Sequence, residues 1–262
     1  VAPACRVASA SGFGDQPPGG SALIVQSRWF ASALDWASTS GKRVTNNSNS
    51  FSSSSTVTSQ YAATHAAGMI HFSSAGNQGV ASLNYPASLS DVMAVTSVTS
   101  WGVQTNNYGS GLDFAAPGLD IATTFIGSSY VLASGTSVAT PYAAGVAALV
   151  LSVDSIFTNT EVEQILRDTA TDMGAPGYDT TFGYGLVNAA AAVKLAMKTT
   201  ELAWSQAVVP GTLAPAAFNN IVKTASYEFA KILSGASASI AGVTVSSAAD
   251  AEAMLNSSLS QG

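Results

Sequence analysis

The sequence predicts an α/β fold in three layers, with a mostly parallel β-sheet that helices cover on both faces. Short runs of strand-forming residues alternate along the chain with longer segments of helical period, an order typical of right-handed βαβ units. One of these segments, 134–150, is almost wholly apolar after a polar start, as expected for a core helix. With 262 residues, 47% of them hydrophobic, the chain can bury a sizeable core.

The expected elements alternate in type along the chain. Strand-like residues run to about Ala10, and glycines and prolines make 11–20 a loop. Apolar residues at helical spacing predict a helix over 21–40 that ends at Gly41. After it we expect, in order, a strand at 43–47, a helix over 56–67, strands at 69–73, 91–98, 121–124 and 130–133, the core helix, and a helix to about Thr169 that Thr160 and Glu163 cap.

Composition excludes several functional classes. The net charge is −6 and lysine and arginine do not cluster, so we expect no nucleic-acid partner. Cys5 is the only cysteine, which excludes an internal disulfide, and with His65 and His71 as the only histidines there is no zinc cluster. The apolar segment 134–150 is shorter than a typical bilayer span. Few charges and abundant Ser, Thr, Asn and Ala favour an extracellular or cell-surface location.

The start of the apolar segment carries the first chemical motif. Ser137 lies in its first turn, where unpaired N–H groups and the helix dipole favour an anion. The run Gly135-Thr136-Ser137-Val138-Ala139-Thr140-Pro141 closely resembles the nucleophile motif of the subtilisin-like serine peptidases, with departures at Val138 and, just beyond the run, at Tyr142. The alternative is a buried serine in a helix cap.

A second motif lies upstream of the first. Ser74-Ala75-Gly76-Asn77-Gln78-Gly79 resembles the segment of that family in which the Asn amide donates to the oxyanion of the tetrahedral intermediate. The resemblance makes Asn77 the candidate donor, with the backbone N–H of Ser137 as the second. The alternative is an ordinary asparagine in a turn.

The resemblance also assigns the walls of a substrate cleft. Gly12 and Gly14 belong to a loop that pairs with an extended substrate. Across the cleft lie Ser48-Asn49-Ser50, where the family has Ser-Leu-Gly, and Ser74-Ala75-Gly76. Asn84 replaces the glycine at the base of the specificity pocket and precedes Tyr85-Pro86, a peptide commonly cis in the family. These departures narrow the pocket and make it more polar, and they leave the substrate preference open.

Two motifs of the family's triad are absent from the sequence. The Asp of the first central strand and the His of a His-Gly-Thr-His helix start both precede Val1 in the family pattern. We reject His65 as a substitute because its position corresponds to the end of a surface helix, and we expect His71 to be a strand residue. The resemblance therefore implies the C-terminal two-thirds of a peptidase, with a sheet that lacks its N-terminal strands.

The implied activity is that of a serine endopeptidase, which cleaves protein or peptide substrates through an acyl-enzyme on Ser137. An N-terminal segment would supply Asp and His, so we expect the chain alone to be inactive. The chemistry needs no cofactor, and although structural calcium is common in the family, no metal site is assigned here. The alternative is a non-catalytic relative that binds peptides or partners, which would need neither Ser137 nor Asn77.

The expected organisation is a truncated catalytic domain over 1–199 and an Ala/Ser-rich extension over 200–262 with one amphipathic helix. The chain starts with Val1 rather than Met and shows no signal peptide, from which we expect a processed product or a piece of a longer chain. Without the Asp-bearing strand, the strands near 5–10 and 43–47 face a gap or pair with each other. We therefore expect marginal stability.

Overall fold

The computed structural model describes residues 6–10, 13–14, 24–206, 238–240 and 243–245. The chain divides into two compact units, the first formed by 1–149 and 157–188 and the second by 150–156 and 189–262. All described residues of the candidate site belong to the first unit. The amphipathic helix expected in the C-terminal extension lies outside the described residues.

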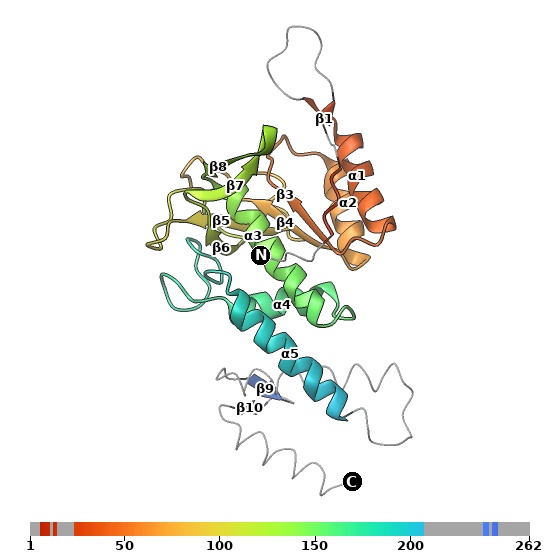
Figure 1. Cartoon of the computed structure of the whole chain (residues 1–262), viewed down its shortest axis with the longest axis vertical. Coiled ribbons are helices and arrows are strands. Elements are labelled where there is room, and N and C mark those ends of the chain that lie inside the picture. The colour runs from red at the N-terminus through yellow and green to blue at the C-terminus, as the bar shows by residue number, and fades with distance from the viewer. Residues whose placement is uncertain (1–5, 11–12, 15–23, 207–237, 241–242, 246–262) are drawn as a thin grey trace, which may run out of the picture. The chain divides into compact units, whose positions relative to one another are not determined.

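The first unit is built on a four-stranded sheet in which every pairing is parallel (Figure 1). Its order is β3 (Val44–Asn47), β4 (Ile70–Ser74), β5 (Met93–Val98) and β6 (Leu112–Pro117). Every residue of β4 and β5 is buried, as expected for parallel strands covered on both faces. The predicted α/β class is therefore confirmed.

The described residues form five α-helices: α1 (Ser27–Thr39), α2 (Ser55–Ala66), α3 (Thr136–Val153), α4 (Asn159–Thr169) and, in the second unit, α5 (Ala189–Gln206). Helices α1 and α2 pack through a cluster of Leu34, Val57, Tyr61 and Val92. The helix predicted over 21–40 starts later than expected, because β2 (Ile24–Val25) pairs antiparallel with β1 (Phe13–Gly14).

The capping box of α4 lies two residues earlier than predicted. The Thr158 hydroxyl accepts the N–H of Glu161, and the Glu161 carboxylate accepts the N–H of Thr158 at 2.7 Å. Thr160 and Glu163 have the same spacing, but both lie within the helix, and Glu163 is buried. The end of the helix at Thr169 agrees with the prediction.

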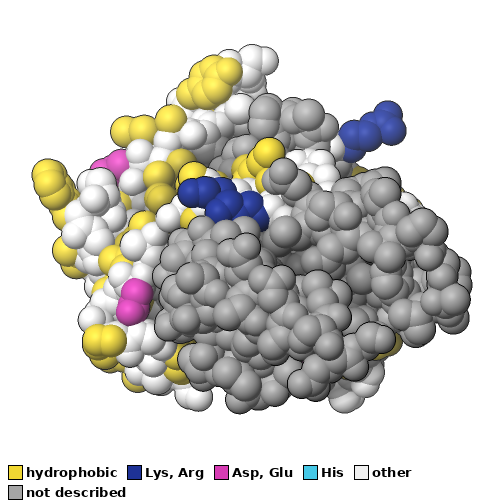
Figure 2. Space-filling model, turned by 90° about the horizontal axis from the view of Figure 1, so that it is seen from below, with side chains coloured by type: hydrophobic (Ala, Val, Ile, Leu, Met, Phe, Trp, Pro, Cys, Tyr) yellow, Lys and Arg dark blue, Asp and Glu magenta, His cyan; other side chains and the backbone are white. Residues whose placement is uncertain are grey.

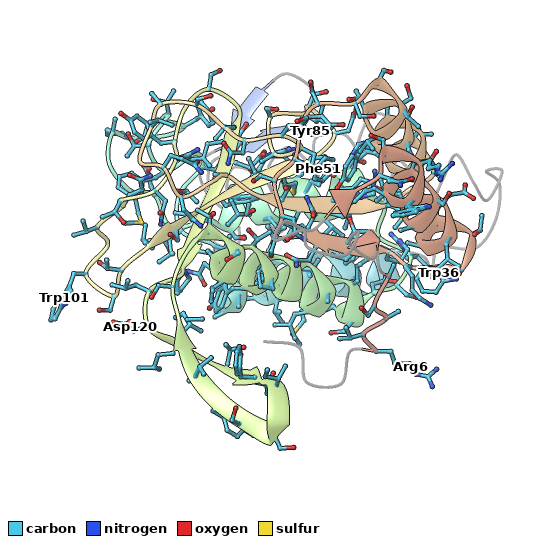
Figure 3. All side chains as sticks on the ribbon, turned by 90° about the horizontal axis from the view of Figure 1, so that it is seen from above. Arg6, Trp36, Phe51, Tyr85, Trp101 and Asp120 are labelled. Atoms are coloured by element: carbon cyan, nitrogen blue, oxygen red, sulfur yellow. The ribbon has the colours of Figure 1, made fainter. Side chains whose placement is uncertain are left out.

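The remaining described strands form short antiparallel pairs. In the first unit β7 (Ile121–Phe125) and β8 (Ser129–Ala133) join through the 3₁₀ turn η1 (Ile126–Ser128), and the hairpin extends away from the sheet (Figure 3). In the second unit β9 (Ala238–Ile240) pairs antiparallel with β10 (Val243–Val245). Among the described residues that Figure 2 shows in colour, charged side chains are few and stand among apolar and neutral ones, in keeping with the composition.

Strand β3 forms an open edge of the sheet, since among the described residues it pairs with β4 alone. The prediction that the first residues form a strand is wrong for 6–10, which are exposed and extend no sheet. The two segments therefore leave the gap between them unfilled.

A groove of about 460 Å³ occupies this gap. The walls of the groove are β3, residues 6–8 and 10, apolar side chains of α1 and small residues of α3. The helical residues in its lining are Phe30, Ala33, Leu34, Trp36, Ala37, Pro141, Ala144, Gly145 and Ala148.

Helix α3, the predicted core helix, is not buried on every side. Ala143, Val146 and Ala147 are buried, whereas Pro141 is exposed and borders the groove with Gly145. The helix has 18 residues and ends at Val153, three residues beyond the predicted segment. By length and composition it could cross a membrane. A core helix passes the same test, and its place beside the sheet in Figure 1 is that of a core helix.

Candidate active site

The carboxyl ends of β3 and β4 bring two predicted cleft segments together. Asn47 pairs with Ser73 at the end of the parallel ladder, so the residues that follow the two strands leave the sheet at the same edge. The turn before α3 joins this edge, because the N–H of Gly135 donates to the carbonyl of Gly118, just after β6. Binding sites of parallel sheets lie at this edge.

The side chain of Asn77 is fixed through its oxygen. Its Oδ1 accepts the backbone N–H of Thr136 at 2.9 Å and the Thr136 hydroxyl at 2.8 Å. That hydroxyl in turn accepts the N–H of Gly76 at 3.3 Å. In the described part of the chain the Nδ2 group of Asn77 has no hydrogen-bond partner, so both of its hydrogens are available next to the residue that precedes Ser137.

The start of α3 leaves a second donor unused. The N–H groups of Val138 and Ala139 donate to the carbonyl of Gly135, and that of Thr136 donates to Asn77. The N–H of Ser137 makes no such bond with any described residue, as is usual in the first turn of a helix. Two N–H donors therefore belong to the positive end of α3, one from Ser137 itself and one from Asn77, whose side chain is bonded to the preceding residue, Thr136.

Pro141 changes the hydrogen bonding of the Ser137 carbonyl. In a regular helix the carbonyl of Ser137 would accept the N–H four residues later, but Pro141 has none. The carbonyl instead accepts the hydroxyl of Ser48 at 2.8 Å. Ser48, at the end of β3, is thus tied directly to the candidate nucleophile.

The glycine of the second motif is required by its backbone and by its neighbours. Gly76 has φ of +114°, in the region that favours glycine, and a Cβ there would lie 2.4 Å from Nδ2 of Asn107 and 2.6 Å from Nδ2 of Asn84. The flanking Ser74 and Ala75 are buried. Because the side chains of Ser74 and Ala75 are buried, a ligand could contact this segment only through its backbone.

Asn84 connects both predicted walls of the specificity pocket. Its backbone N–H donates to Ala75, and its Nδ2 donates to Ser50 Oγ and to Gln78 Oε1, both at 3.2 Å. Its Oδ1 accepts from Asn107 at 3.3 Å. The Tyr85–Pro86 peptide that follows is cis, as the resemblance implied.

The structure ties the other predicted cleft residues less directly to Ser137 and Asn77. Asn49 is exposed, and its carbonyl accepts from Asn47 at 2.8 Å. Gly14 lies in β1, and Gly12 lies outside the described residues. Among the described residues no group of three His, Cys, Asp or Glu side chains is arranged to hold a metal ion.

Both histidines are engaged elsewhere. His71 is fully buried in β4, with Nδ1 2.7 Å from Thr45 Oγ1 and Nε2 3.0 Å from Thr64 Oγ1. Burial, with a smaller contribution from His65, lowers the pKa of His71 to about 3. His71 is therefore a neutral strand residue at ordinary pH, as its position in the sequence indicated.

His65 lies near the opposite edge of the sheet, at the end of α2 that leads into β4. The five residues of β4 rise about 3.3 Å each, which separates this end from the Ser137 edge by roughly 15 Å. His65 Nε2 lies 2.9 Å from Glu163, and Arg167 lies 3.8 Å from Glu163 and 3.4 Å from Asp113.

Three residues of the site were not identified from the sequence. Thr136 fixes Asn77, and Gln78 and Asn107 complete the hydrogen bonds around Asn84. Thr136 and Gln78 lie inside the two recognised motifs, beside the residues that were singled out. Asn107 had no such signal, because it reaches the site from the segment between β5 and β6.

A comparison of the sequence with known protein families shows to which family the chain belongs. The profile of the subtilase family matches residues 1–185. The chain belongs to the subtilase family. The predicted resemblance and the three-layer fold class are both confirmed, since solved subtilase structures share the architecture.

Two relatives show how much of the chain is similar to known subtilisins and alkaline proteases. Subtilisin BL of Lederbergia lenta is 37% identical over 168 residues, which cover 63% of this chain and 61% of subtilisin BL. The thermostable alkaline protease of Halalkalibacterium halodurans is 39% identical over 167 residues, covering 63% of this chain and 45% of that protein. The chain thus spans about three fifths or less of these relatives.

Solved structures give the same result. A protease of Pseudoalteromonas arctica is 33% identical, with a TM-score of 0.59, and the match covers 66% of this chain and 59% of that one. The prenylagaramide maturation protease PagA is 25% identical, with a TM-score of 0.60, and the match covers 67% of this chain and 70% of that one.

Proposed function

We propose that this subtilase chain forms part of a serine endopeptidase in which Ser137 is the nucleophile. The observation that carries the proposal is the pair of unused donors at the start of α3. Thr136 holds the side-chain oxygen of Asn77, which leaves the Nδ2 hydrogens of Asn77 available to donate. The N–H of Ser137 is unpaired among the described residues. Two such donors beside a hydroxyl are what acyl transfer requires.

In the proposed reaction Ser137 Oγ bonds to the carbonyl carbon of a peptide bond and loses its proton to a general base. The carbonyl oxygen takes the negative charge and accepts hydrogen bonds from Asn77 and Ser137. The C–N bond then breaks, the base returns the proton to the leaving amine, and an acyl-enzyme on Ser137 remains until water hydrolyses it. These steps need no cofactor.

The general base would come from a segment outside this chain. His71 has hydrogen-bond partners on both ring nitrogens, and His65 lies at the far edge of the sheet. The groove beside β3 supports the idea of a missing strand, since it combines an open strand edge with apolar and small side chains. We infer that a preceding segment fills it with a strand that carries Asp and supplies His nearby.

The substrate would be a protein or peptide, bound in extended form along the cleft segments at 12–14, 48–50 and 74–76. The low share of charged residues favours action outside the cell. The amino-acid sequence itself assigns no calcium ligand, and the chemistry does not depend on one.

The test is covalent labelling of Ser137 by a fluorophosphonate. The 262-residue chain is expressed alone and together with the segment encoded upstream of Val1, which is first inspected for the Asp and His motifs. We expect rapid labelling of Ser137 only when the two parts are combined, and none in Ser137→Ala.

Two results would count against the proposal. Labelling of the isolated chain that disappears in His65→Ala would mean that this histidine is the base. A reconstituted complex that binds peptides but never reacts at Ser137 would favour the non-catalytic binding module instead.

A further inference from the structure

The β7–β8 hairpin carries large apolar side chains that no described part of the chain covers. Ile126 is 80% exposed, Tyr130 78% and Leu132 68%, and Phe125 is more than half exposed. Single exposed apolar residues are common on protein surfaces, but a contiguous group of them marks an interaction surface. Figure 3 shows the hairpin projecting from the body of the first unit, so these side chains are accessible to a partner.

The apolar side chains lie on both faces of the hairpin and at its tip. Tyr130 and Leu132 are two residues apart in β8, so they share one face. Phe125 pairs with Ser129, the neighbour of Tyr130, and therefore lies on the opposite face. Ile126 lies in the turn between the strands. A folded protein or a second copy of the chain would cover one face, whereas a fluid apolar phase can surround the whole tip.

The hairpin also lacks charge. No Asp, Glu, Lys or Arg occurs between Asp120 and Asp154, and no Lys or Arg occurs between Arg43 and Arg167. Transfer of the tip out of water therefore requires no desolvation of a charged group. The missing basic residues give no attraction to anionic headgroups. Aliphatic and aromatic side chains without charge suit the surface of a neutral bilayer, where a tyrosine keeps its hydroxyl in water.

Hydrogen bonding limits how deeply the hairpin can enter a bilayer. At the tip the Ser129 hydroxyl donates to the carbonyl of Ile126 at 2.8 Å, which satisfies both groups locally. The outer edges of a two-stranded hairpin present unpaired backbone groups, which are costly in hydrocarbon. At the base the N–H of Asp120 donates to the Ser134 hydroxyl at 3.0 Å, so a charged residue is fixed there. Only the distal end can therefore enter, and only to the depth of the interface.

We propose that the tip of the β7–β8 hairpin, formed by Phe125, Ile126 and Tyr130, inserts into the interface of a neutral bilayer and holds the chain at a membrane surface. Five residues per strand at about 3.4 Å each place the tip roughly 17 Å from the base. Two residues, Ser134 and Gly135, join β8 to α3. The binding does not depend on the reactivity of Ser137. Under the proposed function, it would favour polypeptide substrates at the same surface.

The test is flotation of the 262-residue chain with unilamellar phosphatidylcholine vesicles. We expect the chain to float with these vesicles. Addition of phosphatidylglycerol should not tighten the binding, because the hairpin has no basic residue and the net charge of the chain is −6. High salt should weaken the binding little, since salt screens charges and not apolar contacts.

Variants identify the hairpin as the element responsible. Ile126→Ser and Tyr130→Ser should each weaken the vesicle partition about tenfold, as expected for the loss of a partly buried apolar side chain. Ile156→Ser is the matched control, because it makes the same change at an isoleucine that is 62% exposed outside the hairpin, and it should bind as the unaltered chain does. Tyr130→Trp keeps an amphipathic ring, and its added fluorescence should shift to shorter wavelength on the vesicles. Circular dichroism checks that each variant is folded.

Three results would overturn the inference. The first is a chain that stays in solution with phosphatidylcholine vesicles. The second is Ile126→Ser that floats as well as Ile156→Ser, and the third is Tyr130→Trp with unchanged emission. Self-association in sedimentation velocity that Ile126→Ser abolishes, without vesicle binding, would assign the surface to a second copy of the chain instead. Failure of the proposed function leaves all these measurements unaffected, since none requires Ser137 to react.

Discussion

Buried His71 makes the stability of the fold sensitive to acid. The ring is 0% exposed, and burial lowers its pKa from 6.5 to about 3. In the unfolded chain it protonates below about pH 6.5, whereas in the folded chain it stays neutral down to about pH 3. The unfolded state therefore binds the proton first, and stability falls as the pH drops through this window.

The size of the effect follows from the two pKa values. Each pH unit between them is worth about 1.4 kcal/mol, so lowering the pH from 7 to 5 should remove about 2 kcal/mol of unfolding free energy. Asp113 acts in the opposite direction, since burial raises its pKa to about 6 and its protonation in the folded state adds stability on acidification. The two effects partly cancel in the unaltered chain.

The variant His71→Gln isolates the histidine. Glutamine can bond to both Thr45 and Thr64 but does not titrate, and Asp113 is common to both proteins. Urea unfolding at pH 7 and pH 5 should show that the difference in unfolding free energy between variant and unaltered chain shifts by about 2 kcal/mol in favour of the variant. A shift below about 0.5 kcal/mol would refute a neutral buried His71.

The remaining predictions concern backbone, anchoring and charge. Gly76→Ala should cost more than about 3 kcal/mol in urea unfolding, because the new Cβ meets Asn84 and Asn107, whereas Gly68→Ala, also at positive φ but in open space, should cost only about 1 kcal/mol; equal losses would contradict the close approach. Thr136→Val removes one of the two hydrogen bonds that fix Asn77. Labelling of Ser137 in the reconstituted protein should slow by about tenfold to a hundredfold, while the fluorophosphonate concentration that gives half the maximal rate stays unchanged. An unaltered labelling rate would show that Thr136 does not anchor Asn77. Arg167→Met leaves Asp113, 16% exposed, without its cation and should destabilise the chain by about 3 kcal/mol at pH 7 and by less at pH 5, where Asp113 is protonated, while the exposed Arg28→Met should change stability by less than about 0.5 kcal/mol.

The sequence was most informative where one residue type alone satisfies the backbone. Gly76 and Gly135 take positive φ angles that favour glycine, and the motifs built on them lie at the ends of β4 and before α3 as predicted. The parallel order of strands followed from the alternation of strand and helix patterns. These features are local, so a local reading of the chain recovers them.

Features that depend on distant partners could not be predicted in the same way. Two Thr-x-x-Glu pairs, at 158–161 and 160–163, fit a capping box equally well, and only the fold buries the second glutamate. The start of α1 was misjudged because Ile24–Val25 form β2 and pair with β1. The hydrogen bond from Asn84 to Ser50 joins residues 34 positions apart, and no periodicity in either segment indicates it.

The bond from Ser48 to the carbonyl of Ser137 has a mechanical consequence. It links the residue that follows the edge strand β3 to the first turn of α3, so a movement of β3 is transmitted to the backbone of Ser137 without passing through the rest of the sheet. Under the proposed function, a segment that pairs with that edge would therefore also shift the backbone that carries the candidate nucleophile.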